Sequence, residues 1–194
     1  MIVYCGTSNP GKLREFQLAA GDIEVRGIDA PAPEEHGATF EEIAREKALY
    51  YAAKVNGWVF ADDSGLEVDA LGGAPGVLSA RFAGVGATDA ANNELLLERL
   101  RGVEDRSARF VCVIALARGG RVERTFRGMV EGRIVDAPRG ANGFGYDPLF
   151  FYEPFGCTFG EVTDARKMTV SHRGKALAEM FDYLRTQSSR GVEW

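Results

Sequence analysis

The stretch ARFVCVIALARGG at residues 108–120 contains the longest apolar run of the chain and ends in a glycine pair. Residues 108–117 have the apolar, β-branched character of a buried strand, and Gly119-Gly120 suits a hairpin turn. Residues 121–135 therefore predict one or two returning strands. Because strands and helices alternate earlier in the chain, whereas a hairpin lies here, the sequence predicts a mixed sheet with flanking helices.

Outward from this hairpin, short apolar strands are predicted at residues 2–5 and 58–61, the second leading into Asp62-Asp63-Ser64-Gly65. Apolar residues at helical spacing predict the helices. These are 12–20, 39–55, 88–100 and 171–186. Ser8 or Asn9 is the expected N-cap of the first helix, with Pro10 near its first position. The chain thus reads as an α/β protein, with residues 1–194 forming a single domain.

Composition excludes several classes of protein. The 194 residues carry 23 Lys plus Arg and 28 Asp plus Glu, a net charge of −5, and 45% are hydrophobic. These values are typical of a globular protein and argue against a disordered tail, a coiled coil or a nucleic-acid coat. The eight apolar residues at 110–117 are too few to cross a bilayer, which takes about 20, so no membrane association is predicted.

The cysteines and histidines indicate the cellular compartment and the kind of metal site to expect. The three cysteines lack paired spacing, which predicts no disulfide framework, and the N-terminus shows no signal-peptide pattern. We therefore expect a cytoplasmic protein. With two histidines and no Cys-x-x-Cys pair, a zinc site is not expected, so any metal would be a hard ion held by oxygen atoms.

The segment GTSNPGK at residues 6–12 joins the first strand to the first helix. Backbone N–H groups at a helix start hold anions, and Lys12 adds a full positive charge, so the segment is a candidate phosphate cradle. It fits most of the P-loop pattern, but Leu13 stands where that motif has the hydroxyl that holds Mg²⁺. The alternative is a capped helix after a turn.

Acidic residues form two candidate metal sites. Asp62 and Asp63 are adjacent at the end of a strand, and a divalent cation would relieve their repulsion; the alternative is an acidic turn. Adjacent strand residues face opposite sides, so one could face a cleft. Thr39-Phe-Glu-Glu42 is a capping box. Glu41, Glu42 and Glu46 also place carboxylates at one helix end, where a metal ligand is possible.

Two further segments suit a nucleotide. In GFGYDP, residues 143–148, the glycines on each side of Phe144 could leave its ring free to stack on a base, or the ring could plug the core. Lys167 and the run Ser171-His172-Arg173-Gly174-Lys175 place cations at a helix start, an end that prefers acids. An anionic ligand or a solvated basic cap would each account for this run.

Five segments occur in the order in which they stand in a known family. They are TSNPGK (7–12), TFEEIAREKA (39–48), ADDSGLEVDALGGAPGVLSARFAG (61–84), GFGYDPLF (143–150) and SHRGKAL (171–177). The chain resembles the inosine triphosphate pyrophosphatase family, whose members hydrolyse non-standard purine nucleoside triphosphates. The third segment is long and highly specific, and the five together extend over most of the chain.

The resemblance implies conversion of ITP, dITP or XTP to the monophosphate and pyrophosphate with Mg²⁺, which cleanses the nucleotide pool. It also implies a homodimer of elongated, mixed α/β subunits, each with a twisted sheet flanked by helices and two lobes around a central cleft. Substrate-binding roles fall on Thr7, Ser8, Asn9, Pro10, Gly11, Lys12, Ser64, Phe144, Gly145, Tyr146, Asp147, Lys167, His172 and Arg173. Glu42 and Asp63 would hold the metal, Asp63 would be the general base, and Asp62 is an alternative ligand.

By the same resemblance, the first loop would hold the triphosphate, and residues 144–147 the base or its sugar. Donors from His172, Arg173 or the backbone would pair with the 6-carbonyl of hypoxanthine or xanthine and oppose adenine. Three rivals remain at this point: a P-loop kinase or ATPase, a non-catalytic nucleotide-binding module, and a pyrophosphatase acting on modified pyrimidines. Phosphate release from ATP, binding without turnover, and base preference would distinguish them.

Overall fold

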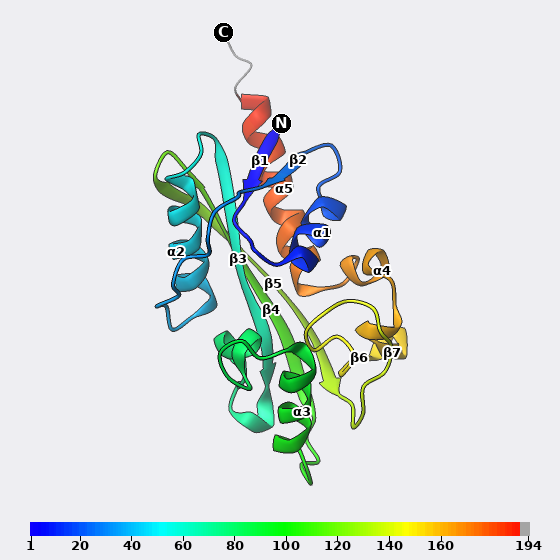
Figure 1. The fold of residues 1–194 in the computed structure, drawn as a ribbon. Coiled ribbons are helices and arrows are strands. Elements are labelled where there is room, and N and C mark those ends of the chain that lie inside the picture. Colours follow the sequence, from blue (N-terminus) through cyan, green and yellow to red (C-terminus); the bar gives the residue numbers. More distant parts are fainter. Residues whose placement is uncertain (191–194) are drawn as a thin grey trace. The chain divides into compact units, whose positions relative to one another are not determined.

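The computed structural model describes residues 1–190 and contains a mixed seven-stranded sheet with the strand order β2-β1-β3-β4-β5-β6-β7 (Figure 1). The strands are β1 (Ile2–Cys5), β2 (Glu24–Gly27), β3 (Trp58–Val68), β4 (Ser107–Arg118), β5 (Arg121–Ile134), β6 (Phe150–Tyr152) and β7 (Cys157–Thr158). β1 pairs in parallel with β2 and β3, whereas β6 pairs antiparallel with β5 and β7. The predicted mixed sheet is confirmed, and Gly119-Gly120 joins β4 to β5 as expected.

The helices are α1 (Pro10–Ala19), α2 (Phe40–Ala52), α3 (Asp89–Arg99), α4 (Asp164–Met168) and α5 (His172–Arg190). Asn9 is the N-cap of α1 with Pro10 at its start, and Thr39 with Glu42 forms the predicted capping box of α2. Short 3-10 turns lie at Asp69–Leu71, Gly76–Arg81, Glu153–Phe155 and Phe159–Glu161. No helix within residues 1–190 has the length and apolar character needed to cross a membrane.

Some predictions need correction. β3 does not end before Asp62 but runs on to Val68, so the acidic-turn interpretation is wrong. The two aspartates can lie inside a buried strand because cations from other elements contact them. Sequence patterns also missed β2, β6, β7 and α4, which have two to five residues each and are too short to show a hydrophobic period.

By its internal contacts the chain divides into two compact units. The first comprises residues 1–63 and 112–128 together with the chain from Arg173 onward. In its core the ring of Phe60 lies edge to face with the rings of Phe16 and Phe181. α5 is buried through Leu177 and Leu184. Within this unit α2 lies on one face of the strands, and α1 and α5 lie on the other (Figure 1).

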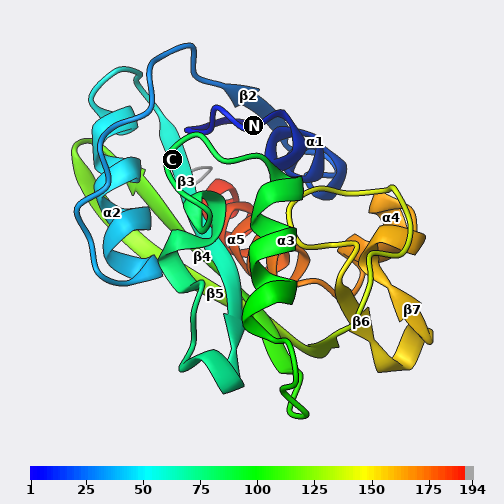
Figure 2. The same cartoon turned by 60° about the horizontal axis from the view of Figure 1, so that its bottom comes forward.

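The second unit comprises residues 64–111 and 129–172. Its core is aromatic: the rings of Phe110, Phe150 and Phe159 lie with centroids 4.6 to 6.3 Å apart. α3 buries Leu96 and Leu100 in this core. Figure 2 shows α3 beside the loop that leads from β5 to β6. The elongated shape, the cleft and the single-domain organisation stay predictions.

Candidate active site

The loop before α1 is organised by its own side chains. Thr7 Oγ1 accepts a hydrogen bond from the Asn9 N–H (3.1 Å), and Asn9 Oδ1 accepts from the N–H groups of Gly11 (2.8 Å) and Lys12 (3.1 Å). The capped helix start is therefore confirmed. Because Asn9 occupies two of the N–H donors at the helix start, an anion here would interact with the Lys12 ammonium and the preceding loop. Phosphate binding by residues 7–12 stays a prediction.

Asp62 faces the side of β3 that α1 and α5 cover. Its carboxylate lies 3.0 Å from Lys12 Nζ and 3.5 Å from the Arg173 guanidinium, and the residue is 1% exposed. Burial opposes the charge of Asp62, but Lys12, Arg173 and Lys47 outweigh it and hold the pKa of this carboxyl well below its usual value. Asp62 is therefore ionised, and its charge is balanced by neighbouring cations.

Asp63 faces the opposite side of β3, toward α2. Burial raises the pKa of its carboxyl to about 6, against the opposing effect of Lys47 and Lys12. Asp63 Oδ1 lies 3.7 Å from Lys47 Nζ, while the buried Oδ2 has no hydrogen-bond partner among the described residues. Two adjacent aspartates thus have pKa values moved in opposite directions, a pattern typical of a catalytic site.

Lys47 is a site residue that the motifs did not reveal. Its ammonium lies 3.4 Å from Glu35 and 3.7 Å from Asp63. Burial lowers the pKa of Lys47, but Asp62, Asp63 and Glu35 more than compensate and raise it. A signal was present in the sequence: Lys47 lies midway between the buried Ile43 and Tyr51, four residues from each, so it interrupts the apolar face of α2.

Arg173 is buried and pairs with two acids of its own unit. It is 2% exposed and pairs with Glu15 at 2.5 Å and with Asp62 at 3.5 Å. Burial opposes its charge, but Glu15 and Asp62 raise the pKa of Arg173 above its usual value. Glu15 was also missed; its position four residues after Gly11 on the buried side of α1 was the available signal. A contact of Arg173 with substrate stays a prediction.

Glu42 is engaged in the cap of α2. Its Oε2 accepts from the N–H groups of Ala38 (2.8 Å) and Thr39 (3.2 Å), and residues 1–190 contain no group of three acidic, Cys or His side chains arranged as a metal site. Asp63 nevertheless fits a hard cation through its buried, unpartnered oxygen. Mg²⁺ needs one or two carboxylates and fills its remaining positions with water and phosphate oxygens, so the residues present fit this ion.

In the second unit, the loop GFGYDP is built around a buried ion pair. Asp147 Oδ2 lies 2.6 Å from Lys167 Nζ, accepts the Phe144 N–H at 3.0 Å, and both charged residues are 2% exposed. Lys167 Nζ also lies 4.9 Å from the centre of the Phe144 ring. The ring that enters the core is that of Tyr146, whose hydroxyl donates to Ser79 O at 2.8 Å. The Phe144 ring remains partly exposed.

The other predicted residues of this unit are placed differently. His172 is 4% exposed and stacks on Phe110, with ring centroids 4.7 Å apart and an interplanar angle of 13°. Ser64 is half-buried in β3, directly after the aspartate pair.

The structure thus brings together Lys12, Asp62, Asp63 and Arg173 in the first unit. It brings together Phe144, Gly145, Asp147 and Lys167 in the second.

A family model, curated relatives and a solved structure all match this chain over most of its length. The Ham1 family matches residues 3–183. The dITP/XTP pyrophosphatase of Syntrophobacter fumaroxidans is 54% identical over 92% of this chain and 80% of its own length, and that of Desulfotalea psychrophila is 46% identical over 100% and 87%. The structure of the Staphylococcus aureus Ham1 protein aligns with a TM-score of 0.85 at 40% identity, covering 96% of this chain and 100% of that one. The chain therefore belongs to the Ham1 family.

Proposed function

We propose that this protein hydrolyses the non-standard purine nucleoside triphosphates ITP, dITP and XTP to the nucleoside monophosphate and pyrophosphate. The observation that carries the proposal is the buried Asp62-Asp63 pair. Asp62 lies 3.0 Å from Lys12 Nζ, and the buried Oδ2 of Asp63 has no hydrogen-bond partner among the described residues. Relatives named dITP/XTP pyrophosphatase, at 46 to 54% identity over more than nine-tenths of this chain, support the same substrate class.

In this proposal Asp63 is the general base. At neutral pH a carboxyl with a pKa of about 6 is largely ionised yet basic enough to accept a proton. Asp63 takes a proton from water as that water attacks the α-phosphorus, and the bond from this phosphorus to the pyrophosphate oxygen breaks. Lys12, in the first turn of α1, neutralises charge on the triphosphate, as phosphoryl transfer requires.

We further propose Mg²⁺ as the cofactor, with Asp63 as a ligand, Glu42 as the second ligand by family resemblance, and Asp62 as the alternative. When bound, the ion supplies charge stabilisation to phosphate oxygens. Treatment with EDTA should therefore reduce ITP turnover to background, and excess Mg²⁺ should restore it. Pyrophosphate release measured before chelation, after it and after Mg²⁺ addition tests this, and full turnover in EDTA would refute the metal requirement.

Base recognition is assigned to the second unit. The partly exposed Phe144 ring is suited to stacking on a purine, and the buried Asp147–Lys167 pair holds the backbone next to it. The residues of this unit proposed to contact the base or its sugar are Phe144, Gly145, Tyr146 and Asp147. By family resemblance, Lys167 and His172, together with Arg173 of the first unit, close over base and phosphates, and Ser64 contacts the substrate. A hydrogen-bond donor that pairs with the 6-carbonyl of hypoxanthine or xanthine would face the 6-amino group of adenine, which is itself a donor. The unpaired donor would strongly disfavour adenine.

A turnover panel tests this function. We expect pyrophosphate from ITP, dITP and XTP, and rates for ATP and GTP that are lower by about 10²-fold or more. Orthophosphate from ATP would instead indicate a P-loop type ATPase, and nucleotide binding without turnover would indicate a binding module. Preference for a modified pyrimidine would overturn the purine assignment. The homodimer and the cytoplasmic location that the resemblance implies stay predictions.

A further inference from the structure

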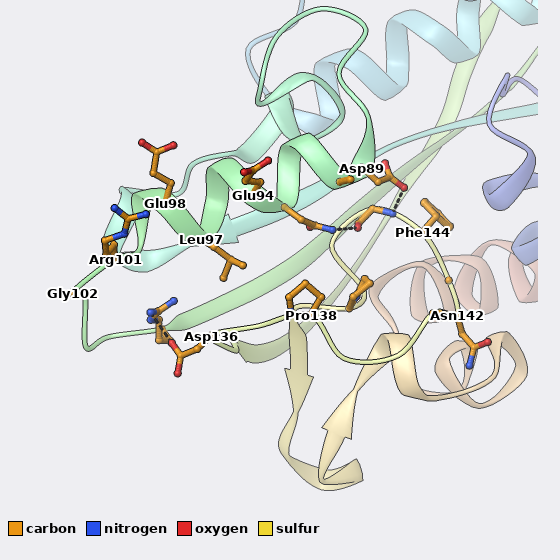
Figure 3. A pocket seen from close by; sticks show the side chains of 17 residues that line it. Asp89, Glu94, Leu97, Glu98, Arg101, Gly102, Asp136, Pro138, Asn142 and Phe144 are labelled. Atoms are coloured by element: carbon orange, nitrogen blue, oxygen red, sulfur yellow. Dashed lines mark hydrogen bonds and ion pairs between the residues drawn. The ribbon is translucent and has the colours of Figure 1, made fainter.

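Two side chains of α3, one helical turn apart, contact the backbone of Gly145. Asp89 Oδ2 accepts a hydrogen bond from the Gly145 N–H at 2.6 Å, and Asn93 Nδ2 donates to the Gly145 carbonyl at 3.1 Å (Figure 3). Both polar groups of this residue are therefore bound by the same helix. Residues i and i+4 lie on one face of a helix, which is why two side chains can reach one peptide segment.

The space beside the Cα of Gly145 is open. α3 and the loop 136–148 border a cavity of about 820 Å³, which Leu97, Pro138 and Gly145 help to line (Figure 3). A Cβ added at Gly145 would meet no atom within 4 Å. At Gly143, by contrast, a Cβ would overlap the Asp147 carboxylate. The backbone at Gly143 is thus confined by the Asp147 side chain, whereas Gly145 is held by its hydrogen bonds to α3 and by the buried Tyr146 that follows it.

Asn93 is chemically suited to this role. It is 9% exposed, and its Oδ1 has no hydrogen-bond partner among the described residues, so the bond to Gly145 is what orients its amide. Rotating the amide would point its oxygen at the Gly145 carbonyl oxygen, which would be repulsive. Asp89 contributes a charge-assisted bond, which is stronger than a neutral one.

We propose that Asp89 and Asn93, here called the α3 clamp, are positioning residues that fix the Gly143–Asp147 loop and so set the Phe144 ring for stacking on the purine base. The inference rests on the proposed function. Phe144 lies between two fixed points: its own N–H is held by Asp147, and the next residue is held by the clamp. A loop anchored at one end would lose the ring orientation that base stacking needs.

The test compares Asn93→Ala and Asp89→Ala with Asn92→Ala. Asn92 is a matched control, because it lies on the same helix, is 3% exposed and makes two backbone hydrogen bonds, to Ala83 N and Ala80 O. We expect each clamp variant to raise KM for ITP about tenfold, with kcat changed less than about twofold, since the clamp positions the base and not the reacting phosphorus. Asn92→Ala should leave KM unchanged.

Asn93→Asp gives a sharper result, because it replaces the donor with an acceptor facing the Gly145 carbonyl. We expect a larger rise in KM for this variant than for Asn93→Ala. Asp89→Asn retains an acceptor for the Gly145 N–H, so its KM should rise less than that of Asp89→Ala. A merely structural role for Asn93 would instead make its variants resemble Asn92→Ala. Equal KM values for Asn93→Ala and Asn92→Ala would overturn the proposal.

Hydrogen–deuterium exchange separates failure of the clamp from failure of the proposed function. Exchange at the Gly145 amide should accelerate in Asp89→Ala and not in Asn92→Ala, whether or not the wild-type protein hydrolyses ITP. An inactive wild-type protein would refute the proposed function alone. Unchanged exchange at Gly145 in Asp89→Ala would refute the clamp, and faster exchange with unchanged KM would refute its role in positioning the base.

Discussion

Replacing Asp63 with asparagine should lower ITP turnover about 10³-fold, within the range that general-base catalysis contributes, and should also stabilise the protein at pH 8. Turnover falls because the amide cannot accept the proton of the attacking water. Stability rises because the wild-type carboxyl is ionised at pH 8 in a buried position that penalises its charge. The opposite signs of the two effects identify a site selected for chemistry and not for stability.

The pH dependence of this stability effect has a defined sign. The pKa of Asp63 is about 6 in the folded protein and 3.8 in an ordinary setting, so the folded state binds the proton more tightly. The stabilising contribution of the protonated carboxyl is complete at low pH and is lost as the pH rises through 6. A shift of this size gives the Asp63→Asn variant an advantage of about 1–3 kcal/mol at pH 8 that disappears near pH 4.

Urea unfolding in EDTA at pH 4 and pH 8 measures this effect, and Asp62→Asn is the matched control. Because Lys12, Arg173 and Lys47 hold the pKa of Asp62 low despite its burial, its charge is stabilising above its ordinary pKa. Asp62→Asn should therefore destabilise the protein at pH 8. A near-normal rate in Asp63→Asn would show that Asp63 is not the base, and a loss of stability at pH 8 would contradict the charge penalty.

The second large effect is expected at Lys167. Lys167→Met removes the cation that contacts the Asp147 carboxylate at 2.6 Å, in a pair whose members are both 2% exposed. Breaking a buried pair by removing one partner costs about 3–5 kcal/mol, because the remaining charge stays buried. The free energy of unfolding should fall by this amount, and KM for ITP should rise because Asp147 also holds the Phe144 N–H.

A double variant separates the two consequences. Lys167→Met with Asp147→Asn removes both charges, so it should recover most of the stability but not the affinity for ITP. Arg185→Met is the surface control, because its pairs with Asp22 and Asp182 are exposed and such pairs are worth about 0–1 kcal/mol. Urea unfolding and KM for ITP are the measurements; a Lys167→Met loss no larger than that of Arg185→Met would contradict the argument.

Much of the local structure could be predicted from the sequence, because the responsible interactions are close in the chain. Asn9 before Pro10, the Thr39–Glu42 capping box and the Gly119-Gly120 turn each act within a few residues. The short strands β6 and β7 could not be predicted, because two or three residues carry no period and pairing decides their existence. The acidic-turn interpretation failed for a related reason: pairing in the sheet extends β3 to Val68, and cations distant in sequence offset the burial of Asp62 fully and that of Asp63 only in part.

The sequence by itself determined the class of fold and the family, because these depend on residue identity and order, and it indicated the residues proposed for the site apart from Glu15 and Lys47. Tertiary structure decided how the environments of the two aspartates differ. Asp62 and Asp63 are identical neighbours, but burial outweighs Lys47 of α2 and raises the pKa of Asp63. On the other face of β3, Lys12 of α1 and Arg173 of α5 hold the pKa of Asp62 low despite its burial. Tertiary structure also revealed the contacts of Asp89 and Asn93 with Gly145, residues more than fifty positions apart. Burial and the charges of distant residues are properties of the folded chain, so no local pattern contains them.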